Sequence, residues 1–167
     1  MKIWRELLGY VKLLVIVVAI ILVINNVVLI NAKIPSPSME KTLMVKDRLF
    51  GFRVAYGINL NLFGHEISEK FKDPKRFDIV IFKYPDDESR LFIKRVIGLP
   101  GEVVEIKDGK VYIDGSPTPL DDSFIPEKMI GSYGPYTVPE NCYFMLGDNR
   151  NDSKDSRLWK NKFVRFD

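Results

Sequence analysis

The sequence predicts a mainly β domain of antiparallel strands that follows one N-terminal membrane anchor. Residues 13–32 carry no charge, and after Lys33 β-branched and aromatic residues alternate with polar ones between glycines, prolines and Asp-Gly pairs. A chain of 167 residues, 46% of them hydrophobic, has room for this anchor and one compact domain of about 130 residues. We therefore expect no second soluble domain.

The anchor is predicted by its length and by the charges in front of it. A helix over residues 13–32 would span about 30 Å, the hydrocarbon thickness of a bilayer. Basic residues outnumber acidic ones before it: Lys2, Arg5 and Lys12 against Glu6. The positive-inside tendency then places residues 1–12 in the cytoplasm and residues 33–167 across the membrane. A buried core helix or a cleaved signal peptide is the alternative, although Ile30 is bulky where cleavage after Ala32 favours a small residue.

Strands are expected where β-forming residues run between turn signals. Three stretches and one hairpin have this character: residues 49–56, 77–84 and 91–98, and residues 102–113 turning at Asp108-Gly109. Pro100-Gly101 suits the tight turn that leads into the hairpin.

Two stretches read as surface segments. Residues 57–76 have mixed charge, two glycines and a weak helical period over residues 66–71, so we expect a surface insertion there. Residues 121–139 hold several prolines and glycines and are expected to be irregular.

Composition excludes several classes of function. The net charge is only +3, so nucleic acid is not an expected partner. Cys142 is the single cysteine and lies in an apolar run, which excludes an internal disulfide. With one histidine, His65, the clustered ligands of a structural zinc site are missing. We expect neither a metal nor a cofactor, and nothing in the sequence indicates an oligomeric state.

A serine-rich loop follows the anchor at Ile34-Pro35-Ser36-Pro37-Ser38-Met39. Pro37 fixes its own backbone angle and favours an extended Ser36, so the loop is stiff. A serine hydroxyl needs a base to become a nucleophile at neutral pH. The loop is otherwise an ordinary linker leaving the membrane.

Lys94 is the best candidate for that base. Strand alternation puts Lys94 on one face with Phe92 and Val96, and Arg95 on the other, and both faces are apolar. Arginine cannot lose its proton in a protein, whereas a desolvated lysine can. Lowering a lysine pKa from about 10.4 to 8 takes roughly 3 kcal/mol of desolvation. His65 lies in the expected insertion and reads as a surface residue.

A third segment, Gly147-Asp148-Asn149-Arg150-Asn151-Asp152-Ser153-Lys154-Asp155-Ser156-Arg157, changes the interpretation of the first two. It does not fit a calcium loop, because the turn glycine would be Ser153 and the closing glutamate Trp159. The Ser36–Glu40 stretch, the run from Lys94 to Gly101 and this segment resemble, in order and wording, the bacterial type I signal peptidases. The resemblance covers most of the chain after Lys33 as well as the anchor, and Phe77-Asp78-Ile79-Val80-Ile81-Phe82 is similar to a further family segment.

The resemblance implies a membrane-bound Ser/Lys protease that removes signal peptides from exported preproteins. It implies the following roles: Ser38 as nucleophile, Lys94 as general base, Ser36 with the Ser38 N–H as oxyanion donors, Ser153 as the serine that orients the lysine, Asp155 and Arg157 as a structural ion pair, and Asp148 as a nearby acid. It also implies apolar subsites for small side chains such as Ala, lined by Ile34, Met39, Ile81, Phe92 and Ile93.

The chain departs from the family pattern at a few places. Pro37 and Phe77 stand where glycine is usual, and Lys41 stands where proline is common. The sequence ends at Asp167, before a further strand that the family has, so the last sheet is expected to be incomplete. Two other functions stay open at this point: a non-catalytic membrane-anchored β module that binds a partner, and a dedicated Ser/Lys peptidase that matures one substrate.

Overall fold

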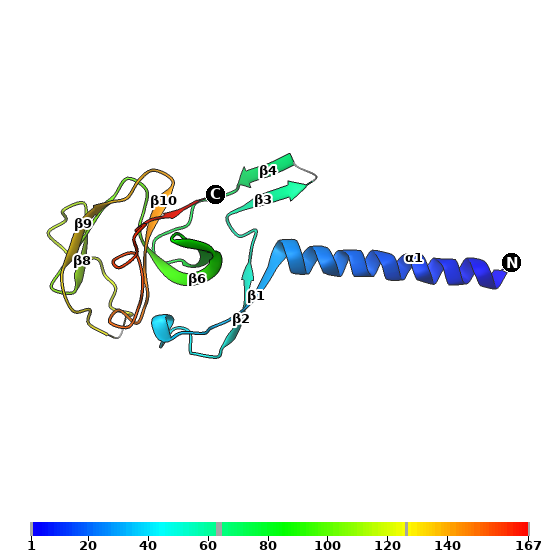
Figure 1. The fold of residues 1–167 in the computed structure, drawn as a ribbon, viewed down its shortest axis with the longest axis horizontal. Helices are drawn as coiled ribbons and strands as arrows, with labels where there is room; N and C mark the ends of the chain where they lie inside the picture. Colours follow the sequence, from blue (N-terminus) through cyan, green and yellow to red (C-terminus); the bar gives the residue numbers. More distant parts are fainter. Residues whose placement is uncertain (1, 63–64, 126, 167) are drawn as a thin grey trace. The chain divides into compact units, whose positions relative to one another are not determined.

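A computed structural model describes residues 2–62, 65–125 and 127–166 and divides the chain into two compact units (Figure 1). Unit 1 comprises residues 1–32 and 48–72, and unit 2 comprises residues 33–47 and 73–167. Eleven strands are assigned within the described residues, against one long helix. The predicted mainly β fold with one N-terminal apolar helix is confirmed.

Unit 1 begins with α1, Lys2–Val23, which runs directly into a π-helical turn, Ile24–Val28. Within Ile3–Val28 an 18-residue stretch has a mean hydropathy of 3.0, and this helix is long and apolar enough to cross a membrane. Its apolar side chains are exposed rather than packed into a core. Asn26 turns its side-chain amide back to the Leu22 carbonyl at 2.8 Å, so the amide is hydrogen-bonded within the helix. The helix ends earlier than residue 32 because Leu29–Lys33 forms strand β1.

Two strand pairs complete unit 1. Strand β1 pairs with β2, Arg48–Phe52. Strand β3, Gly57–Leu62, pairs antiparallel with β4, His65–Lys70, and residues 63 and 64 between them lie outside the described residues. The weak helical period over residues 66–71 does not form a helix: cross-strand hydrogen bonding to β3 overrides this local pattern.

Unit 2 holds two sheets. One is four-stranded with the order β11-β10-β6-β5, formed by β5 (Ile79–Tyr84), β6 (Asp87–Gly98), β10 (Cys142–Leu146) and β11 (Val164–Arg165). The other has the order β8-β7-β9, formed by β7 (Val103–Lys107), β8 (Lys110–Ile113) and β9 (Tyr133–Thr137). Each strand pair in these sheets is antiparallel.

The predicted hairpin turns where expected. Lys107 faces Lys110 across the turn, and Asp108 and Gly109 have φ values of +48° and +77°. Two successive positive φ angles define the tight turn that Asp-Gly pairs favour. Phe77 also adopts a positive φ, +74°, which accounts for the glycine that is usual there in the family the sequence resembles. Its ring packs edge-on against Phe124 at 5.1 Å.

Strand β9 was not expected, since residues 121–139 were interpreted as irregular. The strand contains Gly134 and Pro135, which local propensity disfavours. It lies at the edge of its sheet, where a proline removes no ladder hydrogen bond that a neighbour needs.

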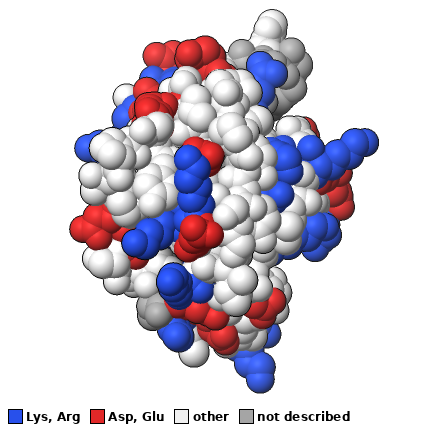
Figure 2. Space-filling view, turned by 90° about the vertical axis from the view of Figure 1, so that its left-hand side faces the viewer, with Lys and Arg blue, Asp and Glu red and all other residues white. Residues whose placement is uncertain are grey.

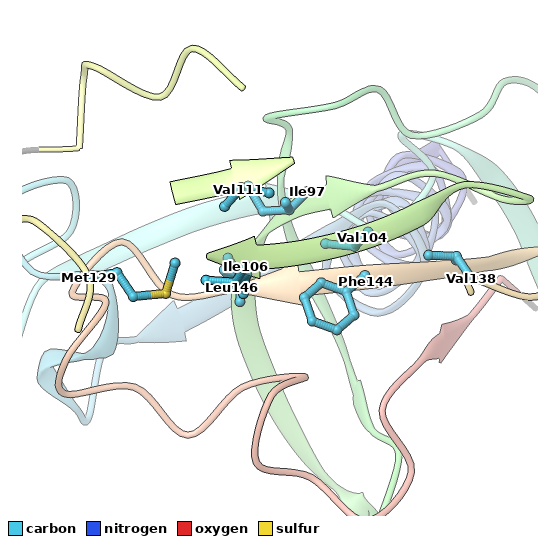
Figure 3. Close-up of a cluster of buried hydrophobic side chains, with 8 residues drawn as sticks. All are labelled: Ile97, Val104, Ile106, Val111, Met129, Val138, Phe144 and Leu146. Atoms are coloured by element: carbon cyan, nitrogen blue, oxygen red, sulfur yellow. The ribbon is translucent and has the colours of Figure 1, made fainter. Parts of the chain in front are cut away.

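The core of unit 2 consists of two apolar clusters. Eight fully or almost fully buried side chains form the first (Figure 3): Ile97, Val104, Ile106, Val111, Met129, Val138, Phe144 and Leu146. The second surrounds Trp159, which is 1% exposed, and includes Tyr84, Val96, Tyr143, Met145 and Val164. Strands β6 and β10 contribute to both clusters, so the site residues next to them rest on a packed support. On the face of unit 2 seen in Figure 2, acidic and basic side chains are interspersed, in keeping with the small net charge.

Candidate active site

Ser38 lies in a short 3-10 turn, Pro37–Met39, which begins three residues after the buried Ile34. Ser36 precedes the turn in an extended conformation, with φ −135° and ψ 156°. Pro37 is the first residue of the turn, where its fixed φ suits the helical backbone and its missing N–H is not needed. The turn closes with a 2.8 Å hydrogen bond from the Glu40 N–H to the Pro37 carbonyl. The proline is thus compatible with the observed backbone.

Asn149, which is distant from this turn in the sequence, stabilises it with two hydrogen bonds. Its backbone N–H donates to the Ser38 carbonyl at 3.1 Å, and its side-chain amide donates to the Pro37 carbonyl at 3.2 Å. No role was predicted for Asn149 from the sequence. Its position in the segment 147–157 was the available signal, but only the folded structure shows its partners.

Lys94 extends from the buried half of β6, the long strand between β5 and β10. The residue is 3% exposed, and its Nζ donates to Ser38 Oγ at 2.6 Å and to the Ile93 carbonyl at 3.0 Å. The Phe92 ring lies 5.4 Å from the same nitrogen. Burial lowers the Lys94 pKa from its ordinary value of 10.5 to about 8, although the charges of Asp155 and Asp148 oppose the shift. A neutral amine beside the Ser38 hydroxyl is therefore accessible near neutral pH.

Two donor groups lie close to the Ser38 hydroxyl. Ser36 Oγ is 3.4 Å from Ser38 Oγ. The Ser38 N–H is among the first N–H groups of the 3-10 turn, and such groups have no intrahelical acceptor. Both donors come from the same short segment, so the turn that positions the hydroxyl also positions them.

The segment 147–157 forms the wall behind Ser38. The Asp155 carboxylate accepts hydrogen bonds from the Gly147 N–H at 3.1 Å and from Arg157 Nε and Nη2, both at 2.8 Å. The ion pair between Asp155 and Arg157 is thus present, with side chains 0% and 4% exposed. A Cβ on Gly147 would clash with the Ser153 hydroxyl and lie 2.5 Å from the Ser38 carbonyl oxygen. Close packing therefore explains the glycine.

Ser153 lies behind Ser38 but makes no hydrogen bond to Lys94. Its residue is 8% exposed, and its Oγ has no partner among the described atoms. A Cβ added to Gly147 would clash with both the Ser153 hydroxyl and the Ser38 carbonyl oxygen. The Ser153 hydroxyl therefore lies close to the turn that carries Ser38. The predicted orienting role of Ser153 stays a prediction.

Asp148 belongs to a second buried ion pair. Arg95 Nε donates to Asp148 Oδ1 at 2.7 Å and Arg95 Nη2 to Oδ2 at 2.5 Å, while the Thr42 hydroxyl donates to Oδ2 at 2.5 Å. Arg95 and Thr42 were not predicted as site residues. Strand alternation placed Arg95 opposite to Lys94, but it did not identify the carboxylate on that side.

The residues expected to line the substrate subsites divide into separate groups. Ile81 and Ile93 are cross-strand partners, both partly exposed, whereas Phe92 shares the face of Lys94 and stacks on Tyr84 at 4.4 Å. Ile34 and Met39 are 2% and 0% exposed and lie on either side of the serine turn. Strand pairing thus brings Ile81 and Ile93 together, with Phe92 directed to the opposite face.

Two observations concern residues outside the site. His65 is exposed at the start of β4 in unit 1. Within the residues that the structure describes, no group of three or more His, Cys, Asp or Glu side chains could hold a metal ion.

Comparisons with known proteins agree on one family. The family model described as "Signal peptidase, peptidase S26" matches residues 7–166. The chain is 40% identical over 132 residues to probable signal peptidase I-2 of Synechocystis, covering 75% of this chain and 53% of that protein. It is 34% identical over 170 residues to signal peptidase I of Pseudomonas fluorescens, covering 86% and 60%. The chain thus spans a little over half the length of these relatives.

Two further signal peptidases match the chain. Probable signal peptidase I-1 of Synechocystis is 34% identical over 163 residues, with 93% of this chain and 76% of that protein covered. The crystal structure of a signal peptidase I from Enterococcus faecalis matches with a TM-score of 0.48 and 36% identity, over 57% of this chain and 92% of that one. The family match over residues 7–166 shows that the chain belongs to the signal peptidases of peptidase family S26.

Proposed function

We propose that the chain is a membrane-bound signal peptidase I that removes N-terminal signal peptides from exported preproteins by means of a Ser/Lys dyad. The observation that carries the proposal is the 2.6 Å distance between Lys94 Nζ and Ser38 Oγ at a desolvated position. Membership of the family supports the reaction class. The geometry supports the two residues that perform it.

Acylation begins with neutral Lys94. Its Nζ takes the proton of the Ser38 hydroxyl as Oγ attacks the scissile carbonyl carbon. The Ser38 N–H and the Ser36 hydroxyl donate to the oxyanion that develops, which stabilises the transition state more than the substrate. The C–N bond then breaks, and the Lys94 ammonium gives its proton to the leaving amine.

Deacylation uses the same base. Water attacks the acyl ester on Ser38 while Lys94 Nζ takes a water proton, and that proton passes to Ser38 Oγ as the signal peptide leaves with a new carboxylate. The 3.0 Å bond from Lys94 Nζ to the Ile93 carbonyl fixes the amine in both half-reactions. No metal or cofactor is needed for either step.

Specificity for small side chains before the cut follows from steric exclusion. Of the residues expected in the subsites, Phe92 lies on the opposite face of β6 from Ile93, so we propose subsites among Ile34, Met39, Ile81 and Ile93. Ile34 and Met39 are already fully packed. A side chain larger than Ala would have to displace them, at the cost of strain. We therefore expect an Ala-X-Ala type of cleavage site.

Cleavage of a preprotein by the purified full chain tests the proposal. Wild-type protein should cut after an Ala-X-Ala site, as read by mass spectrometry of the new N-terminus. Ser38→Ala and Lys94→Arg should each lower the rate by at least about 1,000-fold, because an arginine cannot serve as a base. Ser89→Ala and Lys83→Arg, at exposed positions of unit 2, should cleave like wild type.

The controls also separate the proposal from its rivals. His65→Ala should be nearly silent, because His65 lies in unit 1 and outside the site. Substantial turnover by folded Lys94→Arg would overturn the lysine base. A wild-type chain that binds preproteins without cutting any would be the non-catalytic module instead.

A further inference from the structure

Arg150 has an unusual environment for a buried guanidinium. Its side chain is 2% exposed, and its Nη1 donates to Asp122 Oδ2 at 2.7 Å. The other two nitrogens, Nε and Nη2, are buried and have no hydrogen-bond acceptor in the described part of the chain. An unpaired buried donor of a charged group is costly, so an acceptor outside the polypeptide is expected.

The edge of the Arg150 guanidinium without an acceptor consists of Nε and Nη2, and the same two nitrogens bind carboxylates in other arginines of this molecule. Arg95 and Arg157 each use Nε together with Nη2 to hold the two oxygens of one carboxylate, Asp148 and Asp155 respectively. In Arg150 only the opposite nitrogen is paired. The guanidinium therefore presents the geometry of a bidentate carboxylate contact with the carboxylate missing.

Arg150 forms part of the wall of a cavity of about 290 Å³. The charged residues on this wall are Lys110, Asp122, Glu127, Lys128 and Arg150. Asp122 already accepts from Arg150, and Glu127 accepts from Asn151 Nδ2 at 3.0 Å. The three cations exceed the two acids, so the local charge favours a small anion.

We propose that this cavity binds a small carboxylate, held in bidentate fashion by Nε and Nη2 of Arg150. The volume excludes a folded partner, and a planar two-oxygen group matches the guanidinium edge better than a tetrahedral one. Because both nitrogens are covered, the ligand displaces part of the irregular stretch around Asp122 and Ser123 as it binds. That stretch has neither helix nor strand to resist the movement.

One backbone carbonyl connects the proposed carboxylate site to the ion pair in the segment 147–157. The Arg150 carbonyl accepts from Arg157 Nη2 at 2.7 Å, and Arg157 pairs with Asp155. Asn149, the neighbour of Arg150, holds the Ser38 carbonyl. An occupied site stabilises the 147–157 segment independently of whether the proposed peptidase reaction is correct.

Thermal unfolding of the full chain in detergent tests the proposal. Sodium acetate and sodium succinate are titrated against sodium chloride at equal ionic strength, with inorganic phosphate as a further arm. At five times Kd a carboxylate should raise Tm by about 3 °C, and at higher concentrations the increment should grow with the logarithm of the carboxylate concentration. Arg150→Lys keeps the charge but lacks the planar edge, so its carboxylate-dependent increment should vanish. The matched control Arg90→Lys, at an exposed arginine, should retain it.

A second variant keeps the test decisive if Arg150→Lys does not fold. Asp122→Asn weakens the competing internal contact and removes one negative charge from the cavity wall, so the carboxylate concentration that raises Tm by about 3 °C should fall several-fold. An unchanged concentration overturns the proposal. Equal increments in wild type and Arg150→Lys also overturn it, because they indicate a general salt effect. A phosphate increment as large as that of acetate overturns the assignment to a carboxylate.

Discussion

Arg95 and Asp148 form a buried bidentate ion pair, with Nε 2.7 Å from Oδ1 and Nη2 2.5 Å from Oδ2. Arg95 follows Lys94 in β6, and Asp148 follows Gly147 in the wall behind Ser38. The pair therefore connects the strand that carries the proposed base to the segment that supports the nucleophile. The Thr42 hydroxyl donates a hydrogen bond to the same carboxylate, so the segment that follows the serine turn is also connected to this ion pair.

Asp148→Asn should destabilise the protein by about 3–5 kcal/mol, because it leaves the Arg95 guanidinium buried without its counter-charge. Urea unfolding monitored by tryptophan fluorescence measures the loss, since Trp159 lies in the core. Asp152→Asn, at an exposed position of the same segment, is the matched control and should change stability by less than about 0.5 kcal/mol. Equal stability of the two variants would show that the ion pair contributes nothing net.

The pH dependence of cleavage should follow the Lys94 amine. Burial lowers its pKa to about 8, so roughly a tenth of the protein holds the neutral base at pH 7 and roughly half at pH 8. We expect kcat/KM to rise about tenfold per pH unit below this pKa and to level off above it. The measurement is a kcat/KM profile from pH 6 to 9 with chemistry shown to be rate-limiting. A flat profile would contradict a lysine base.

The same shift predicts a pH-dependent gain in stability from Lys94→Met. In the unfolded chain the Lys94 pKa returns to its ordinary 10.5, so between about 8 and 10.5 the unfolded state binds more protons. Stability of the wild type therefore rises with pH over this window. Below about pH 8 the folded protein bears the full free-energy cost of burying the charged Lys94 amine. Removing the amine should gain about 3 kcal/mol at pH 7, and the gain should shrink between pH 8 and 10. Urea midpoints of both proteins at pH 7 and 10 measure the difference; a gain independent of pH would mean that burial of methionine, not loss of charge, is responsible.

Local patterns predicted the strands that bring the site together. Alternation predicted the strand of Lys94, Asp108-Gly109 predicted the β7–β8 turn, and the order of three segments indicated Ser38 and Lys94 as candidates by resemblance to the family. These signals are encoded within a few residues, and both faces of β6 are buried over residues 94–98, as the apolar pattern there indicated.

What the sequence did not predict depends on partners that are distant in the chain. Strand β9 exists because it pairs with β7 despite Gly134 and Pro135. Asn149 reaches Pro37, 112 residues away, and Thr42 reaches Asp148, 106 residues away. No propensity or spacing rule specifies such contacts before the fold is known.

Pro37→Gly tests whether the proline preorganises the serine turn. Pro37 occupies the first position of the turn, so glycine there should fold but lose about 0.4–1 kcal/mol, because the unfolded chain gains freedom. We expect a moderate fall in kcat as Ser36 and Ser38 become more mobile. Pro117→Gly, at an exposed proline outside the helices and strands, controls for the general entropy effect. A tenfold rise in activity would show instead that the native proline distorts the site.

The proposed anchor should hold Ser38 at the depth where preproteins are cut. From Val28, where the apolar helix ends, to Ser38 is ten residues, which reach at most about 35 Å when fully extended. If the apolar helix spans the bilayer with residues 1–12 in the cytoplasm, the nucleophile must lie within that distance of the outer membrane surface. A preprotein whose own apolar segment is still embedded presents its cleavage site there, and confinement of both chains to one membrane raises their effective concentration.

A truncated chain that begins at Leu29 tests this account. It keeps β1, which pairs with β2, and it keeps all of unit 2 with Ser38 and Lys94. We expect it to cut short soluble peptides at the rate of the full chain but to process a preprotein reconstituted in vesicles at least about 100-fold more slowly, the size of advantage that tethering provides. The peptide assay is the internal control, because it reports an intact dyad without the membrane. Equal processing of the embedded preprotein by both forms, or labelling that finds a cysteine placed at Ser36 on the cytoplasmic side, would contradict the role assigned to the anchor.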